Sequence, residues 1–256
     1  MTSVLLRYLE QKLTFKPTAT EYGGLSGFNA TRFRFGSGFG LDLDGVFVDV
    51  GSKPVVLFIH GNKHNLTRFS DHYTLFRELG LSFMSFDYPG YGTSRGVPSE
   101  HAAYAAARAA HAHLRNELGR APHEIIVYGC SMGGAVAIEL LQHYPAHSLI
   151  TESTFTNSWE MAQHLYPLLP VWRMLPKRFP NDERIGKVQA PLLMLHGDAD
   201  GVVPVHMAHT LFTLAPTGTQ LHIIPGANHV NSVAAGGTRL REKLSHFITA
   251  RQPPHE

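Results

Sequence analysis

The chain has 256 residues, of which 43% are hydrophobic and 16% charged, and this balance excludes an intrinsically disordered protein. A formal net charge of +2, carried by scattered basic residues, argues against a nucleic-acid-binding protein. The single cysteine allows no internal disulfide, and no run reaches the roughly 18 apolar residues of a membrane span. We therefore expect a cytoplasmic protein with no leader peptide and no integral membrane segment.

Short apolar runs alternate with longer helical patterns along the whole chain. Residues 55–59 are unbroken Val, Leu, Phe and Ile, which is typical of a strand buried on both faces. Similar runs cover residues 81–86, 125–128, 149–150, 192–195 and 221–224, and residues 32–35 and 46–50 predict an antiparallel pair before them. Helices are predicted at residues 65–79, 99–118, 132–143, 205–215 and 238–250. The pattern predicts one α/β domain over residues 1–256, with a mostly parallel central sheet of about eight strands flanked by helices.

One segment, at about residues 155–188, interrupts this alternation. It is rich in large apolar side chains, among them Trp159, Leu165 and Trp172, and four prolines divide it. Prolines at this density prevent one long helix, so we expect short helical pieces over the sheet. They form either a satellite cluster on the main core or a short cap whose inner face receives an apolar substrate group.

The stretch from Gly129 to Gly133 contains two candidate nucleophiles, Cys130 and Ser131. It has the form Gly-x-Ser-x-Gly, follows a predicted strand and opens a predicted helix, which is the context of a nucleophile elbow. In such a turn the serine projects beyond the carboxyl edge of the sheet, and its neighbour points beneath the turn. We therefore predict that Ser131 is the nucleophile and that Cys130 is a small buried apolar side chain.

A serine nucleophile needs a base and an acid that orients the base. In chains with a nucleophile elbow, the acid comes after the serine in the sequence and the histidine comes after the acid. Asp198 and Asp200 come directly after the predicted strand at 192–195, and Asp200 has the better position, just before the next helix. His229 follows the last predicted strand in a glycine-containing loop. The expected partners are Asp200 and His229, with Asp198 as the alternative acid that more simply shapes the turn.

The loop after the first central strand, His60-Gly61-Asn62, is placed to complete the site. Its backbone amide at Asn62 and the amide of Met132, at the start of the helix after Ser131, are the predicted donors to an oxyanion. His60 is predicted to brace this loop rather than to transfer protons.

From about residue 17 onward the chain resembles the alpha/beta-hydrolase superfamily. The motifs that carry the likeness are the elbow and the segments 60–62, 87–94, 98–100 and 196–200. Within the superfamily they are similar to small serine hydrolases that include esterases, lysophospholipases and acyl-protein thioesterases. The resemblance implies a Ser131–His229–Asp200 triad, oxyanion amides at Asn62 and Met132, and no metal or organic cofactor. Unlike many members of the subgroup, this chain has Lys63 and His64 after the oxyanion loop and no membrane anchor, which disfavours membrane-lipid and lipidated-protein substrates.

The predicted function is hydrolysis of a carboxylic ester or thioester with an apolar acyl or alcohol group, through an acyl-enzyme on Ser131. The substrate is a small molecule, and Lys63 and Tyr91 are predicted to border the mouth of its pocket. Perhydrolase or carbon–carbon bond hydrolase activity on the same triad, and a catalytically silent binding scaffold, remain alternatives. The 17 histidines form no set with the spacing of metal ligands, so no metal site is predicted.

Overall fold

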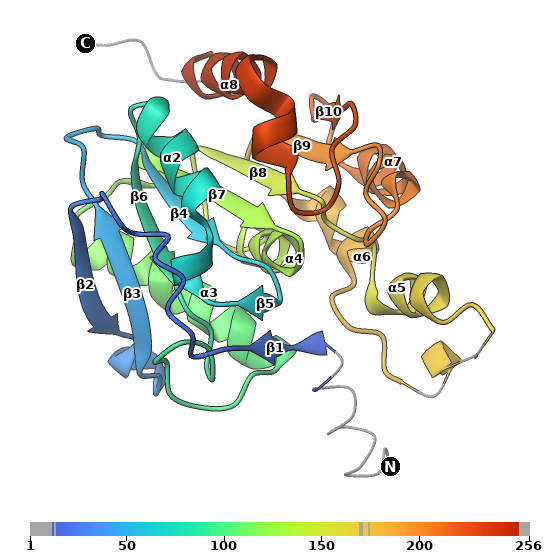
Figure 1. The fold of residues 1–256 in the computed structure, drawn as a ribbon, viewed down its shortest axis with the longest axis horizontal. Coiled ribbons are helices and arrows are strands. Elements are labelled where there is room, and N and C mark those ends of the chain that lie inside the picture. Colours follow the sequence, from blue (N-terminus) through green and yellow to red (C-terminus); the bar gives the residue numbers. More distant parts are fainter. Residues whose placement is uncertain (1–11, 13, 169–170, 174, 251–256) are drawn as a thin grey trace.

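A computed structural model describes residues 12, 14–168, 171–173 and 175–250, and it has one large sheet at its centre (Figure 1). The sheet has eight strands in the order β10-β9-β8-β7-β4-β6-β3-β2, and β3 runs in the direction opposite to the other seven. The strands are β2 (Ala30–Phe35), β3 (Leu43–Val48), β4 (Val55–Ile59), β6 (Ser82–Phe86), β7 (Ile125–Cys130), β8 (Ser148–Glu152), β9 (Leu192–Gly197) and β10 (Gln220–Ile224). This is the mostly parallel sheet that the sequence predicts.

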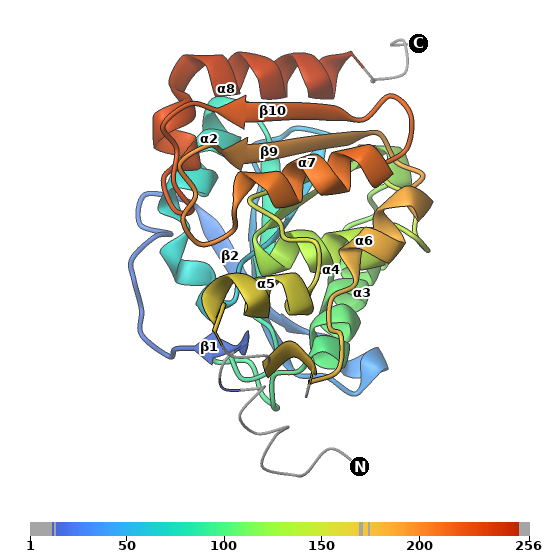
Figure 2. The ribbon, with the colours of Figure 1, turned by 90° about the vertical axis from the view of Figure 1, so that its right-hand side faces the viewer.

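Helices cover both faces of the sheet, and each face has its own apolar core. The helices are α2 (Ser70–Glu78), α3 (Glu100–Asn116), α4 (Met132–Leu140), α5 (Ser158–Leu165), α6 (Asn181–Arg184), α7 (Val205–Leu214) and α8 (Ser232–Thr249). Side chains of α3, α4 and α7 pack in one core, and those of α2 and α8 pack in the other. Figure 2 shows α8 running beside β10, whereas α7 lies on the opposite side of β9 and β10. Strands β4, β7 and β8 are buried along their whole length because both faces are covered.

Three local features differ from the sequence prediction. The predicted helix at 65–79 divides into a 3-10 turn, η2 (Leu66–Arg68), and α2. A short helical segment from Ser232, which was not predicted, precedes the predicted helix at 238–250, and the two meet in α8 at a non-helical kink at Gly237, where φ is 49°. A two-residue parallel pairing of β1 (Lys16–Pro17) with β5 (Lys63–His64) was not predicted, since runs this short carry no periodicity.

Between β8 and β9 the chain forms short pieces, as the prolines predict. They are α5, η4 (Val171–Arg173), α6 and η5 (Ile185–Lys187). Both views show α5 on the outside of the molecule, beyond α4. Within the described ranges, no helix combines the length and the apolar character that crossing a bilayer requires.

Candidate active site

Ser131 lies in the turn between β7 and α4, with φ 55° and ψ −118°. A positive φ is strained for a residue with a side chain, so the surrounding packing has to hold it. Glycines on both sides of the turn allow the backbone segments to pack closely. A Cβ atom at Gly133 would lie 1.8 Å from the carbonyl oxygen of Ile59. At Gly129 it would lie 2.4 Å from the carbonyl oxygen of Gly133. The strand, turn and helix therefore have the form that the Gly-x-Ser-x-Gly stretch predicts.

The three predicted triad residues are within hydrogen-bonding distance of one another. The Nε2 atom of His229 lies 3.1 Å from Oγ of Ser131, and its Nδ1 lies 2.8 Å from Oδ2 of Asp200. The three side chains come from the loops after β7, β9 and β10. Because these strands are parallel, their carboxyl ends share one edge of the sheet, and residues distant in sequence meet there.

Asp200 has the surroundings of an ionised, fixed carboxylate. Its Oδ1 accepts hydrogen bonds from the backbone amides of Val202 and Val203, both 2.9 Å long. Burial by itself raises the pKa of this carboxyl group, but the hydrogen bond and charge of His229, with these two amides, hold the pKa below its ordinary value. Asp198 is exposed and accepts the Gly226 amide at 2.7 Å, which shapes the turn. The structure thus places Asp200 and not Asp198 beside His229.

Cys130 is buried, with 7% of its surface exposed, and it packs in the core beside α2 and α8. Burial raises the pKa of its thiol well above the ordinary value, and the negative charges of Glu152 and Asp200 add to the effect. A buried thiol that stays protonated is a poor nucleophile. Its environment agrees with the choice of Ser131.

The predicted oxyanion loop runs directly against the nucleophile. A Cβ atom at Gly61 would lie 3.4 Å from Cβ of Ser131. The carbonyl oxygen of Asn62 accepts hydrogen bonds from the Lys16 amide and the Tyr91 hydroxyl, at 2.9 and 2.7 Å. The side chain of Asn62 donates to the carbonyl of Thr14 at 2.7 Å. These contacts fix the backbone of Asn62 from several sides.

His60 braces this loop. It is fully buried, its Nδ1 lies 2.7 Å from the carbonyl oxygen of Gly61, and its Nε2 lies 3.2 Å from Oδ1 of Asp87. Burial raises the pKa of Asp87, although the hydrogen bond and charge of His60 act in the opposite direction. Among the described residues the imidazole forms no hydrogen bond or ion pair with the predicted triad, which agrees with a supporting role.

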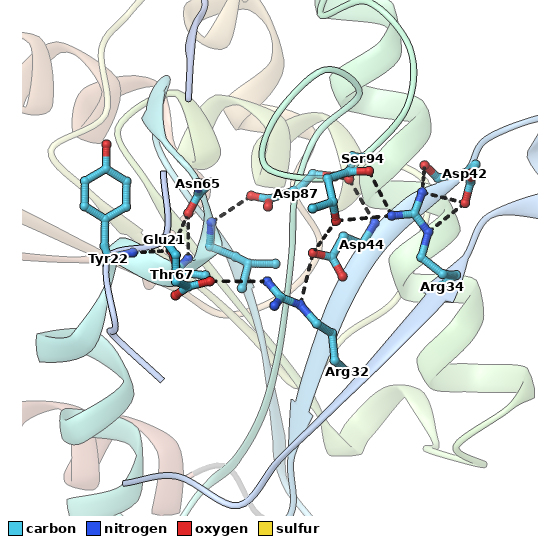
Figure 3. A network of polar contacts seen from close by, with 12 residues as sticks. Glu21, Tyr22, Arg32, Arg34, Asp42, Asp44, Asn65, Thr67, Asp87 and Ser94 are labelled. Atoms are coloured by element: carbon cyan, nitrogen blue, oxygen red, sulfur yellow. Dashed lines mark hydrogen bonds and ion pairs between the residues drawn. The ribbon is translucent and has the colours of Figure 1, made fainter. Parts of the chain in front are cut away.

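A wider network of polar contacts anchors Asp87 (Figure 3). Its Oδ1 accepts the Leu66 amide at 2.7 Å, and its carbonyl accepts the Ser94 hydroxyl at 2.9 Å. Ser94 Oγ also accepts the amide of Asp44, whose carboxylate lies 3.2 Å from Nε of Arg32. The network connects β2 and β3 to the segments that support the Asn62 loop.

Tyr91 does not border a pocket mouth, so this prediction is corrected. Its side chain is fully buried, and its hydroxyl is used in the contact with Asn62. Sequence alone could not separate the two roles, because a tyrosine in a glycine-rich loop suits either. Lys63, the other predicted mouth residue, is exposed in β5, directly after Asn62.

The other predicted substrate contacts lie in and near α5. Trp159 is partly exposed, its Nε1–H donates to the carbonyl of Leu175, and its ring lies 6.3 Å from that of Trp172. Leu165, at the end of α5, is 52% exposed. His164 Nε2 lies 3.4 Å from the carbonyl of Gly201, so the end of α5 is close to the loop that carries Asp200.

Sequence reasoning missed a buried polar cluster beneath the elbow. Glu152, His72 and Tyr128 meet there, and potential ligand atoms of Glu152, His72 and Cys130 lie within 4.8 Å of one another. These three potential metal ligands are far apart in the sequence, so no motif spacing predicts that they meet. The one available signal was a glutamate at the end of a strand that is otherwise apolar or small.

Comparisons with known proteins give this site a context. Residues 51–183 match the family described as “Serine aminopeptidase, S33”. An uncharacterized protein of Mycobacterium tuberculosis (strain H37Rv) is 34% identical over 199 residues, covering 78% of this chain and 71% of the relative. The lysophosphatidylserine lipase ABHD12 of Danio rerio is 33% identical over 233 residues, covering 79% of this chain and 60% of that protein.

Solved structures share the fold. An esterase from Pyrococcus furiosus has a TM-score of 0.77 and 16% sequence identity, and the match covers 94% of this chain and 99% of the esterase. At this identity the likeness concerns the fold alone. It confirms the alpha/beta-hydrolase architecture that the sequence predicts.

Proposed function

This chain belongs to the serine aminopeptidase S33 family of alpha/beta hydrolases, and on that basis we propose that it hydrolyses carboxylic esters or thioesters through an acyl-enzyme on Ser131. One observation carries the proposal: the hydrogen-bonded series from Asp200 through His229 to Oγ of Ser131. An activated serine in this arrangement attacks acyl carbon atoms.

In the first half of the reaction, His229 Nε2 takes the proton of Ser131 as Oγ bonds to the substrate carbonyl carbon. The negative charge on the carbonyl oxygen is received by the amides of Asn62 and Met132, the proposed oxyanion donors. His229 then gives the proton to the departing alcohol or thiol, and an acyl-Ser131 ester remains.

In the second half, His229 removes a proton from a water molecule that attacks the acyl carbon. Collapse of this intermediate releases the carboxylic acid and returns the proton to Ser131. Asp200 stabilises the imidazolium in both halves and keeps Nδ1 protonated, so that Nε2 is free to accept.

We further propose that residues 155–188 are a cap and that an apolar acyl or alcohol group binds beneath it. The exposed apolar side chains of Trp159 and Leu165, with Trp172 nearby, support this. The name of the Danio rerio relative adds a lysophospholipid ester to the substrates worth testing. A cytoplasmic location stays a prediction from the sequence.

The test compares Ser131→Ala with Cys130→Ala, adjacent changes of similar size. We expect Ser131→Ala to abolish labelling by a fluorophosphonate probe and to lower the kcat for p-nitrophenyl esters by about 10⁴-fold or more. Cys130→Ala is expected to retain both. The panel contains p-nitrophenyl esters of increasing chain length, a thioester, a lysophospholipid and an aminoacyl p-nitroanilide, the last because the family description names aminopeptidases. Undiminished turnover in Ser131→Ala refutes the assignment, and failure of the folded wild type to be labelled favours a binding scaffold.

A further inference from the structure

Glu152 connects the nucleophile turn to a buried polar cluster that the proposed reaction does not use. It is the last residue of β8 and the register partner of Cys130, so both side chains project to the same face of the sheet. Its backbone carbonyl accepts the amide hydrogen of Ser131 at 2.7 Å. One residue thus holds the backbone of the strained turn and carries a carboxylate directly beneath it.

That carboxylate is almost completely buried and has two donors on one oxygen. Oε2 lies 2.9 Å from Nε2 of His72, on α2, and accepts the hydroxyl of Tyr128, on β7. Burial by itself raises the pKa of Glu152, but the charge and hydrogen bond of His72, together with Tyr128, bring the pKa below its ordinary value. The group is therefore a buried, partnered charge.

Stability alone is a weak reason for such a charge. Replacing a buried charge and its partners by well-packed apolar side chains is often neutral or stabilising. A partnered carboxylate supplies a fixed geometry that an apolar cluster does not: hydrogen bonds to the charged Glu152 define the relative positions of α2, β7 and β8. Those two strands are the ones that carry Ser131 and the carbonyl that holds its amide.

We propose that Glu152 is a positioning residue for Ser131, acting through its carbonyl and held in place by His72 and Tyr128. The inference rests on the proposed role of Ser131 as the nucleophile. A displacement of about 1 Å at a reacting atom can cost about 10²-fold in rate, so a turn with a strained φ benefits from a rigid support. Loss of that support lowers kcat and leaves substrate affinity nearly unchanged.

The experiment uses Tyr128→Phe, with Glu152→Gln as a second variant. Tyr104→Phe is the matched control, because Tyr104 is also buried and its hydroxyl also donates to a glutamate, Glu100, at 2.7 Å, but Tyr104 lies on α3 and not on the strand that ends at the turn. Three quantities are measured on each folded protein: kcat and KM for a p-nitrophenyl ester, the melting temperature, and amide hydrogen exchange of the peptide containing Ser131.

We expect Tyr128→Phe to lower kcat about tenfold with KM changed less than about twofold, since the variant removes one of the hydrogen bonds that hold the charged carboxylate. Exchange of the Ser131 amide is expected to accelerate by a similar factor. Tyr104→Phe lowers the melting temperature and leaves kcat and Ser131 exchange within about twofold of wild type. Glu152→Gln has the same direction of effect as Tyr128→Phe.

A purely structural role gives a different result. If Tyr128→Phe and Tyr104→Phe have the same kcat and the same Ser131 exchange, Glu152 only stabilises the fold and the proposal is overturned. Faster exchange without any loss of kcat overturns it as well. If the wild type neither hydrolyses esters nor reacts with a fluorophosphonate, the proposed function fails, and the exchange measurement alone then decides whether Glu152 positions the turn.

Discussion

Replacing Asp200 by asparagine tests the triad at its least exposed member, and the structure indicates how the new side chain must orient. Oδ1 of Asp200 receives two backbone amide hydrogens, from Val202 and Val203. An asparagine NH2 group in that place would face two donors, so the carbonyl oxygen of the asparagine has to occupy it. The NH2 group is then directed at Nδ1 of His229, which lies 2.8 Å from Oδ2 in the native protein.

This orientation imposes the wrong tautomer on His229. Nδ1 becomes an acceptor, Nε2 carries the proton, and the atom 3.1 Å from Oγ of Ser131 can no longer remove a proton. Such a change in a serine triad lowers kcat about 10⁴-fold, which is about 5.4 kcal/mol at about 1.36 kcal/mol per factor of ten. Because the side-chain shape is conserved, we expect the fold and KM to change little.

The assay is steady-state hydrolysis of a p-nitrophenyl ester by Asp200→Asn, with Asp198→Asn as the control. Asp198 is two residues away and exposed, and its carboxylate accepts a hydrogen bond from the Gly226 amide, so its variant should retain kcat within about threefold. Retention of a tenth or more of the kcat by Asp200→Asn, or an equal loss in both variants, would show that the acid is assigned wrongly.

Two further changes test the turn and its support. Gly133→Ala places a Cβ atom 1.8 Å from the Ile59 carbonyl oxygen, so α4 must move from β4, and we expect a loss of about 3 kcal/mol and a melting temperature lower by about 6 °C or more. Gly38→Ala, which adds a Cβ with nothing within 4 Å, should change little, and equal melting temperatures would contradict the packing argument. Glu152 has a pKa below its unfolded value of about 4.3, so its stabilisation is complete above that pH and is lost as the pH falls through the lower, folded value. Urea unfolding between about pH 5 and pH 3 should show a shallower loss of stability in Glu152→Gln than in wild type, and parallel curves would refute this.

The order of the site residues along the chain was readable from the sequence because it depends on local patterns. A buried strand, a glycine-flanked serine and a helix specify the turn at Ser131 by sterics alone. Asp200 and His229 follow parallel strands, and parallel strands end at one edge of the sheet, so their meeting with Ser131 needed no knowledge of packing. Of the two candidate acids, Asp200 contacts His229 and Asp198 bonds the Gly226 amide, so the choice of Asp200 as the acid stays a prediction that this geometry supports.

Contacts between distant segments were decided only by the tertiary structure. Tyr91 is buried against Asn62 because the loop after β6 folds over the loop after β4, and no periodicity in either loop encodes that. Glu152 and His72 are 80 positions apart, and their pairing follows because α2 packs on the face of the sheet to which the Glu152 side chain projects. Sequence patterns report which face of an element is apolar, whereas the partner of a buried polar group depends on how elements pack in three dimensions.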